Sequence, residues 1–205
     1  MKKSIIKTIL TTATISMFVL PCSGVSEVSA AQAKPTATPA TKATAAPIMR
    51  DNLAKYGLVK EVELPVTIEK EGFSYTLEKI MIYESSSPTA QSLIKKYGYY
   101  GDKKYFIWTK ITIQNNSKSV VQFSSKDLSD KWRLNFGERS VTDMPQKFYA
   151  TVNSKEALWT WKLNSGEKLS TYQAYLYNDT FKEFYVSVHM KNSQTFKQIA
   201  NIKEN

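Results

Sequence analysis

Hydrophobic residues recur at every second position in several stretches of this chain. In residues 105–113 one phase of the alternation consists of Tyr105, Ile107, Thr109, Ile111 and Ile113. Residues 73–82 alternate in the same way, but the apolar phase slips at Glu78-Lys79, as it does where a β-bulge adds one residue to a strand. A period of two is typical of β-strands, so both stretches are predicted to be strands.

Shorter runs of the same kind, separated by turn residues, fill much of the remaining chain. Alternation is clear at 172–176 and 184–190, and weaker candidates lie at 119–124, 131–136, 147–152 and 157–162. Between the runs stand the turn-forming sequences Asn115-Asn116-Ser117, Phe136-Gly137, Asn164-Ser165-Gly166 and Asn178-Asp179. Residues 88–97 alone suggest a helix. About eight or nine short strands with one short helix predict an all-β sandwich or barrel.

The first thirty residues have the composition of a secretory signal peptide. Three lysines precede an apolar stretch from Ile9 to Leu20, and the segment ends at Val28-Ser29-Ala30, which suits a signal peptidase. We expect cleavage after Ala30, or after Ala33 as the second choice, and therefore an extracellular protein. The apolar stretch is too short and too interrupted for a transmembrane span. A lipoprotein anchored at Cys22 is the alternative, although Pro21 stands where that processing needs a small residue.

Residues 31–49 are predicted to be a flexible linker between the signal peptide (1–30) and one domain at 50–205. The segment 31–47, AQAKPTATPATKATAAP, contains no aromatic and no large aliphatic residue, so it cannot form a core. The domain is long enough for one hydrophobic core. Since Cys22 is the only cysteine, its removal with the signal peptide would exclude disulfides and thiol catalysis.

The chain is basic, with a formal charge of +10 at pH 7. Removal of residues 1–30, which carry three lysines and one glutamate, leaves +8. Outside the cell a basic surface meets anionic wall polymer, phospholipid headgroups or acidic proteins rather than nucleic acid. The alternative is that the charge serves solubility alone.

The order of the turns and strands resembles a known family. The sequences ITIQNNSKS, VQFSSKDLSDKWRLNFGER and LNSGEKLSTYQAYL are similar to immunoglobulin-like modules of the immunoprotective extracellular antigen type, found in secreted proteins and lipoproteins of Gram-positive bacteria. The matching positions are Asn115, Asn116, Phe123, Asp127, Asp130, Gly166 and Glu167. The resemblance covers about residues 65–190, and Ser165 stands where the family usually has proline. It implies an immunoglobulin-like β-sandwich at the cell surface and supplies no catalytic residues.

Few residues qualify for catalysis or metal binding. The one histidine, His189, lies at an outward phase of its strand, with no second histidine to complete a catalytic or zinc site. Asp127, Asp130 and Asp143 are the candidates for calcium, but lysines surround them and the Asp-rich calcium loop is absent. We therefore expect no enzyme activity, no metal and no cofactor.

The tryptophans leave two interpretations open. Trp159 and Trp161 share one face of a predicted strand, which is either core or an exposed aromatic binding face, and we expect core. Trp108 alternates with Ile107 and is expected on the exposed side of its strand, together with Phe106.

Residues 95–104, KKYGYYGDKK, are the best candidate site. They belong to a twenty-residue insert between two strands, and long connections in sandwiches are often functional. Lysine beside tyrosine suits an anionic ligand that also stacks on aromatic rings. The predicted ligand-binding residues are Lys95, Lys96, Tyr97, Tyr99, Tyr100, Lys103 and Lys104. The alternative is a soluble connection whose tyrosines cover the end of the sandwich.

Two functional hypotheses follow. The first is an exported, non-enzymatic module that binds a cell-surface or extracellular partner, anionic wall material being one such partner. The second is a secreted proteinase inhibitor that presents residues 138–147, ERSVTDMPQK, in which Met144-Pro145 would restrict the backbone.

Overall fold

A computed structural model describes residues 49, 51–123, 131–137, 140–190 and 193–202. All of them belong to one compact unit, residues 46–205. The predicted signal peptide (1–30) and almost all of the predicted linker (31–49) lie outside the described residues, so both remain predictions.

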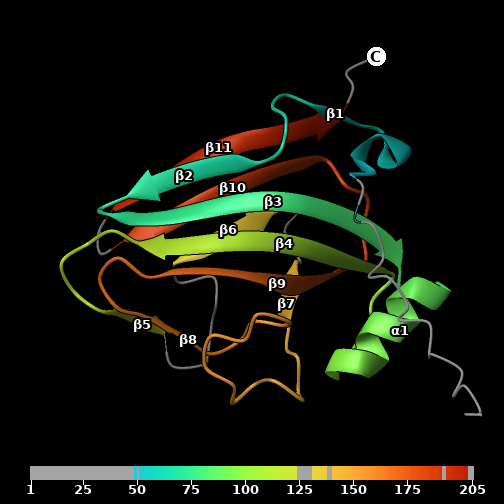
Figure 1. Cartoon of the computed structure of the whole chain (residues 1–205). Coiled ribbons are helices and arrows are strands. Elements are labelled where there is room, and N and C mark those ends of the chain that lie inside the picture. The colour runs from blue at the N-terminus through green and yellow to red at the C-terminus, as the bar shows by residue number, and fades with distance from the viewer. Residues whose placement is uncertain (1–48, 50, 124–130, 138–139, 191–192, 203–205) are drawn as a thin grey trace, which may run out of the picture. The chain divides into compact units, whose positions relative to one another are not determined.

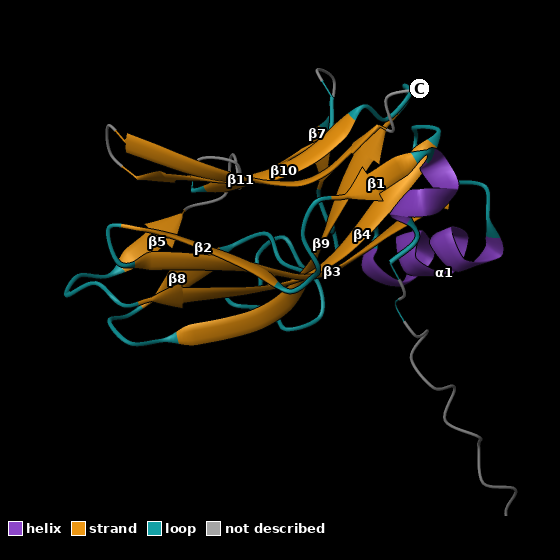
Figure 2. Ribbon diagram, turned by 90° about the horizontal axis from the view of Figure 1, so that it is seen from above, coloured by secondary structure: helices purple, strands orange, loops and turns teal. Residues whose placement is uncertain are grey.

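Two antiparallel sheets form the body of the domain (Figures 1 and 2). The five-stranded sheet has the order β2-β3-β4-β9-β7 and comprises β2 (Val66–Lys70), β3 (Phe73–Glu84), β4 (Tyr105–Asn115), β9 (Lys168–Tyr177) and β7 (Val141–Asp143). The four-stranded sheet has the order β1-β11-β10-β6 and comprises β1 (Leu58–Lys60), β11 (Ser193–Ile202), β10 (Glu183–Met190) and β6 (Trp132–Asn135). A third, two-stranded sheet pairs β5 (Val121–Phe123) with β8 (Trp161–Leu163).

The main core lies between the two large sheets, and large aromatic rings fill it. Phe73 and Tyr75 on β3 stack on Trp132 of β6, with ring centroids 5.8 and 5.9 Å apart. Trp161 of β8 lies against the same tryptophan at 5.1 Å. All four side chains are at most 1% exposed. The predicted all-β sandwich is therefore confirmed.

The predicted bulge and helix are present, whereas the number and position of the strands differ in part from the prediction. The β3–β4 register shifts between Leu77 and Lys79, which is the bulge predicted from the slip in alternation. The expected helix over residues 88–97 is α1 (Pro88–Tyr97). Eleven strands are present in the described residues instead of eight or nine. The strands that were not predicted are β1, β2, β7 and β11; β2 has only two alternating apolar residues, Val66 and Ile68, and the other three show no clear alternation. Where a strand was expected over residues 147–152, residues 147–150 form a turn and Val152 makes only an isolated bridge to Thr160.

Helix α1 gives the domain a second, smaller core. Ser87 caps its first turn by accepting the N–H of Ala90, and Gly98, with a φ of 76°, ends it in the left-handed conformation that glycine tolerates best. Leu93 of α1 belongs to the apolar cluster on the outer face of the five-stranded sheet, near the end of β3 and the start of β4 (Figure 1). Trp108 lies in that cluster and is 4% exposed, so the prediction that it is exposed was wrong.

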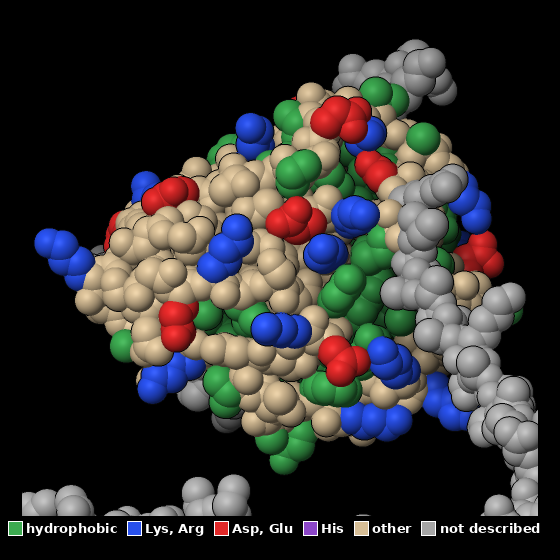
Figure 3. Space-filling view, in the orientation of Figure 1, with side chains coloured by type: hydrophobic (Ala, Val, Ile, Leu, Met, Phe, Trp, Pro, Cys, Tyr) green, Lys and Arg blue, Asp and Glu red, His purple; other side chains and the backbone are tan. Residues whose placement is uncertain are grey.

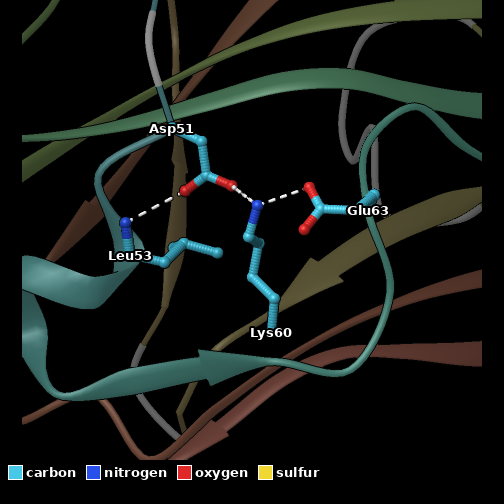
Figure 4. Close-up of polar contacts among 4 residues, drawn as sticks. All are labelled: Asp51, Leu53, Lys60 and Glu63. Carbon is cyan, nitrogen blue, oxygen red and sulfur yellow. Dashed lines mark hydrogen bonds and ion pairs between the residues drawn. The ribbon is translucent and has the colours of Figure 1, made fainter.

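The chain before β1 is fixed to the sandwich by polar contacts (Figure 4). Asp51 accepts the N–H of Leu53 at 3.0 Å, at the start of the short helix η1 (Leu53–Tyr56). Lys60 of β1 lies 3.4 Å from the Asp51 carboxylate and 2.5 Å from that of Glu63. Hydrogen bonding to Glu63 is the main cause that raises the pKa of Lys60; partial desolvation opposes the shift, and Asp51 adds to it. These contacts tie the segment before β1 to that strand.

Candidate functional site

Residues 95–104 form the end of α1 and the connection from α1 to β4. The segment runs beside the turn that follows β7: the N–H groups of Gln146 and Lys147 donate to the carbonyls of Gly98 and Tyr97 at 3.1 and 3.2 Å. A ladder of this kind leaves the connection little freedom. The candidate stretch is thus built into the domain and is not a free loop.

The three tyrosines of the stretch have different environments. Tyr97 and Tyr99 are 6% and 5% exposed, and Trp108 lies against both, with ring centroids 5.5 and 5.8 Å away. Burial is the main cause that raises the pKa of Tyr99 well above its usual value, and the nearby Asp143 adds to it. Tyr100 is 58% exposed. Only Tyr100 therefore presents an open ring to solvent, while Tyr97 and Tyr99 cover the end of the sheet, as the alternative interpretation proposed.

Two of the four lysines lie beside acidic groups. Lys96 Nζ is 3.2 Å from Glu156 and 3.0 Å from the Tyr97 hydroxyl, and the bond to Tyr97 is the main cause that raises the pKa of Lys96. Lys103 Nζ is 3.5 Å from Asp102.

Within the described part of the chain, the other two lysines of the stretch form no ion pair. Lys104 extends over the Tyr105 ring at 4.9 Å from its centroid. Lys95 is exposed, and its carbonyl accepts a 2.7 Å hydrogen bond from Lys147 Nζ, which places a further ammonium group at the end of α1. Figure 3 shows basic side chains over the α1 end of this face, with acidic ones among them.

Asp143 of β7 holds the connection between α1 and β4 in place through hydrogen bonds. It is 2% exposed, and its two carboxylate oxygens accept the N–H groups of Tyr100 and Gly101, each at 3.2 Å. Burial raises the pKa of this carboxyl, and the backbone hydrogen bonds partly oppose the shift. Asp143 therefore acts as an internal hydrogen-bond acceptor; the other two calcium candidates, Asp127 and Asp130, lie outside the described residues.

The segment proposed for proteinase inhibition, residues 138–147, is partly described. Val141–Asp143 is strand β7 and pairs with β9, while Pro145 is buried. Residues 138 and 139 lie outside the described part. Within the described part, the exposed positions are Val141, Gln146 and Lys147.

A groove of about 390 Å³ crosses the outer face of the four-stranded sheet. We call it the β10 groove. Its lining includes outward-facing side chains of three adjacent strands, among them Arg133 and Asn135 of β6, Tyr185, Ser187 and His189 of β10, and Phe196 of β11. Sequence reasoning singled out only His189 here, because β11 had not been recognised as a strand.

A chain of hydrogen bonds runs along the floor of the β10 groove. Asn135 Nδ2 donates to Ser187 Oγ at 3.2 Å, and Ser187 Oγ lies 3.0 Å from His189 Nε2. A serine beside a histidine at this distance resembles a nucleophile with its base, which also needs a third group to orient the histidine. Among the described residues no carboxylate is recorded against His189, and the pair is explained as neighbours on one strand.

Two of the tryptophan predictions concern the core. Trp161 is 1% exposed and Trp159 is partly buried against the main core, so both pack on the core as expected. The strand predicted over 157–162 is present only as β8 from Trp161, and Leu158 is buried as well, so the two tryptophans do not define one inward face of a strand.

The turn residues of the family resemblance lie at one corner of the sandwich. Asn115 is buried, its side-chain amide donates to the carbonyls of Ser119 and Leu163, and its backbone bonds both Gly166 and Glu167. Asp127 and Asp130 lie outside the described residues, as does the side chain of Phe123. The matched positions that are described thus have structural roles.

In the described ranges, no group of three or more His, Cys, Asp or Glu side chains is placed to hold a metal ion. The described helices include none that is long and apolar enough to cross a bilayer.

Comparisons with known proteins give no family. No family model matches the chain, and no curated protein matches it. Among solved structures, the yjhA protein from Bacillus subtilis is similar with 12% identity and a TM-score of 0.38, over 60% of this chain and 78% of that one. A functionally unknown protein from Listeria monocytogenes EGD-e is similar with 14% identity and a TM-score of 0.41, over 76% of this chain and 90% of that one.

Proposed function

We propose that the protein is an exported, non-enzymatic, immunoglobulin-like module that attaches to an extracellular or cell-surface partner, with anionic wall polymer as the ligand. This proposal is supported by the cluster of lysine ammonium groups at the C-terminal end of α1. Lys147 Nζ donates to the carbonyl of Lys95, and the adjacent Lys96 forms an ion pair with Glu156. Ammonium groups fixed on a folded surface attract a polyanion without requiring a shaped pocket.

Two of these lysines also stabilise helix α1. Lys95 and Lys96 occupy its last turn, where positive charge interacts well with the helix dipole. This contribution is only about 0.3–1 kcal/mol per residue, and the exposed pair with Glu156 adds about 1 kcal/mol or less. Neither effect is large enough to make these lysines necessary for folding, so their removal tests binding.

The experiment replaces Lys95, Lys96, Lys103 and Lys104 together by serine. Adsorption to purified anionic wall polymer, measured over a salt series, should weaken and lose much of its salt dependence. Screening within a Debye length of roughly 8 Å at physiological salt is the physical reason. The melting temperature should fall by no more than a few degrees.

A matched variant controls for net charge. It carries serine at four other exposed lysines, Lys79, Lys118, Lys168 and Lys182, and so loses the same charge elsewhere. The proposal requires this control to bind more strongly than the α1 variant. Equal loss in both variants would mean that only overall charge matters, and unchanged binding in the α1 variant would refute the proposed site.

A further inference from the structure

We propose that the β10 groove binds a neutral oligosaccharide. This site lies on the outer face of the four-stranded sheet, whereas α1 and its lysines lie on the outer face of the five-stranded sheet. The inference therefore goes beyond the proposed binding of wall polymer and stands on different residues.

The shape of the groove follows from strand register. Ser187, in the middle of β10, is directly opposite Arg133 on one side and Phe196 on the other. Side chains on one sheet face are about 4.8 Å apart between strands and about 7 Å apart along a strand, so a small residue between large ones makes a hollow. Ser187, 5% exposed, is the floor, and Arg133 and Phe196 are the walls. Tyr185 and His189, two residues away along β10, form the ends. A volume of about 390 Å³ lies in the usual range for small-ligand sites.

The groove has an apolar wall that contributes little to the fold. Phe196 is 66% exposed in the interior of a strand, and its ring lies edge-on to Tyr185 with centroids 6.3 Å apart. A pyranose ring presents a face of C–H groups that packs on such rings. A single exposed aromatic residue is ordinary. Here it forms one side of a concave polar site, which is the arrangement that a sugar requires.

The remaining lining is polar and combines side-chain amides, which donate and accept hydrogen bonds, with the Arg133 guanidinium, which donates, and the Glu183 carboxylate, which accepts. Gln194 supplies an amide from β11, while the NH2 groups of Asn135 and Gln198 already donate to the protein and leave their amide oxygens as acceptors. Arg133 stands opposite the aromatic wall. Sugar hydroxyls also donate and accept, so amides match them well. A chain of hydrogen bonds already fixes Asn135 to Ser187 and Ser187 to His189, which holds the floor in place before a ligand arrives.

Charge decides between a neutral and an anionic ligand. The lining contains one cation, Arg133, one carboxylate, Glu183, and no lysine. Counting the imidazole as neutral, the net charge is zero, in contrast to the basic chain as a whole. A phosphate or carboxylate polymer would gain no attraction there, because Glu183 offsets Arg133. A neutral glycan needs directional hydrogen bonds and an apolar face, and both are present.

The test is calorimetric titration of the full chain with neutral hexasaccharides of glucose, N-acetylglucosamine, mannose and xylose. At least one should bind, and its affinity should stay constant as salt rises from about 0.05 to about 0.5 M, since no charge is neutralised. Phe196→Ala and, separately, Gln194→Ala should each weaken binding about tenfold or more. Tyr149→Ala removes another exposed aromatic ring (56% exposed) outside the groove and should leave the affinity unchanged.

Other outcomes would overturn the inference. They are binding of no hexasaccharide at millimolar concentration, binding that falls with salt, binding that survives both groove variants, and preference for a peptide, which would pair with a sheet edge instead. The four-lysine variant keeps the two proposals apart. It should bind the oligosaccharide normally even if it loses anionic polymer.

Discussion

Replacing Asp143 by alanine tests whether this buried carboxylate holds the connection between α1 and β4. Both of its oxygens are used, by the N–H groups of Tyr100 and Gly101 at 3.2 Å, and a backbone bond from Met144 adds to them. Alanine removes all of these acceptors. The amides of Tyr100 and Gly101 would then depend on water that must enter a region where Asp143 is 2% exposed.

The magnitude follows from the number and length of these bonds. A hydrogen bond to a charged group contributes about 1.5–3 kcal/mol, and 3.2 Å is long enough to place these near the lower limit. Two such bonds give about 3 kcal/mol, from which relief of the buried charge subtracts up to about 1 kcal/mol. The variant should lose about 2–3 kcal/mol of unfolding free energy, or about 4–12 °C in melting temperature for a domain of this size.

The pH dependence has a definite sign. Burial raises the pKa of Asp143 in the folded protein above that in the unfolded chain. Between the two pKa values the folded state binds more protons, so the stability that this group contributes is full below about pH 4 and falls as pH rises. Asp143→Asn, which cannot titrate, should lack this fall. The free-energy difference between wild type and Asp143→Asn should thus be larger at acidic pH than at pH 7.

Urea unfolding at several pH values measures both effects, with Glu69→Gln as the control, since Glu69 is an exposed carboxylate on β2. A loss below about 0.5 kcal/mol in Asp143→Ala, the range of ordinary surface changes, would show that the two bonds do not hold the connection. A difference between wild type and Asp143→Asn that grows toward pH 7 would contradict the assigned direction of the pKa shift.

Three further predictions concern the second core, the close contact between Gly137 and Tyr177, and the N-terminus of the mature protein. Trp108→Ala should cost about 3–5 kcal/mol by urea unfolding and speed amide exchange in α1, because its ring stacks on Tyr97 and Tyr172; an unchanged α1 would count against this. Gly137→Ala would push a Cβ against the Tyr177 hydroxyl and should lower the free energy of unfolding by about 1–3 kcal/mol, whereas a neutral result would mean that the tyrosine can move. Mass spectrometry of the secreted product should find Ala31 as the first residue, and a diacylated Cys22 would refute the predicted cleavage.

Alternation in the sequence correctly predicted the strands in which every second residue is apolar along the whole strand. In β10, Phe184, Val186, Val188 and Met190 all face the core, and the strand is evident from the sequence. In β11, Thr195 and Lys197 occupy the inward register opposite Val188 and Val186, and Lys197 is exposed. Only Ile199 and Ala200 of β11 are buried, so the strand carries no apolar pattern. Pairing with β10 determines this strand, and such pairing is not visible in a single sequence.

The sequence around Trp108 contains a signal from which its burial could have been predicted. Phe106 and Trp108 on one face of β4 and Ile107 on the other are all large and apolar, and a strand of this kind is typically covered on both sides. The helix predicted over 88–97 has an apolar face that needs a partner, and that partner is the second face of β4. Combining the two observations would have placed Tyr97 and Tyr99 in a core.

The β10 groove could not have been predicted in this way, because its parts are far apart in the sequence. Arg133 and Phe196 become opposite walls only through the register of β6, β10 and β11. Their spacing along the chain carries no pattern. His189 was noticed because it is the one histidine, and its outward phase was correctly read from the alternation.

The two outer faces of the sandwich differ in what their aromatic residues do, and this difference makes binding testable on one of them. On the five-stranded sheet, Tyr97 at the end of α1 and Tyr99 just after it are buried in the second core, so a change there alters stability and binding together. On the four-stranded sheet, no described element covers Phe196, whose nearest recorded ring is Tyr185. Removal of this exposed ring should change the unfolding free energy by no more than about 0.5 kcal/mol. A loss of oligosaccharide binding in Phe196→Ala at unchanged stability would therefore be due to the missing contact alone.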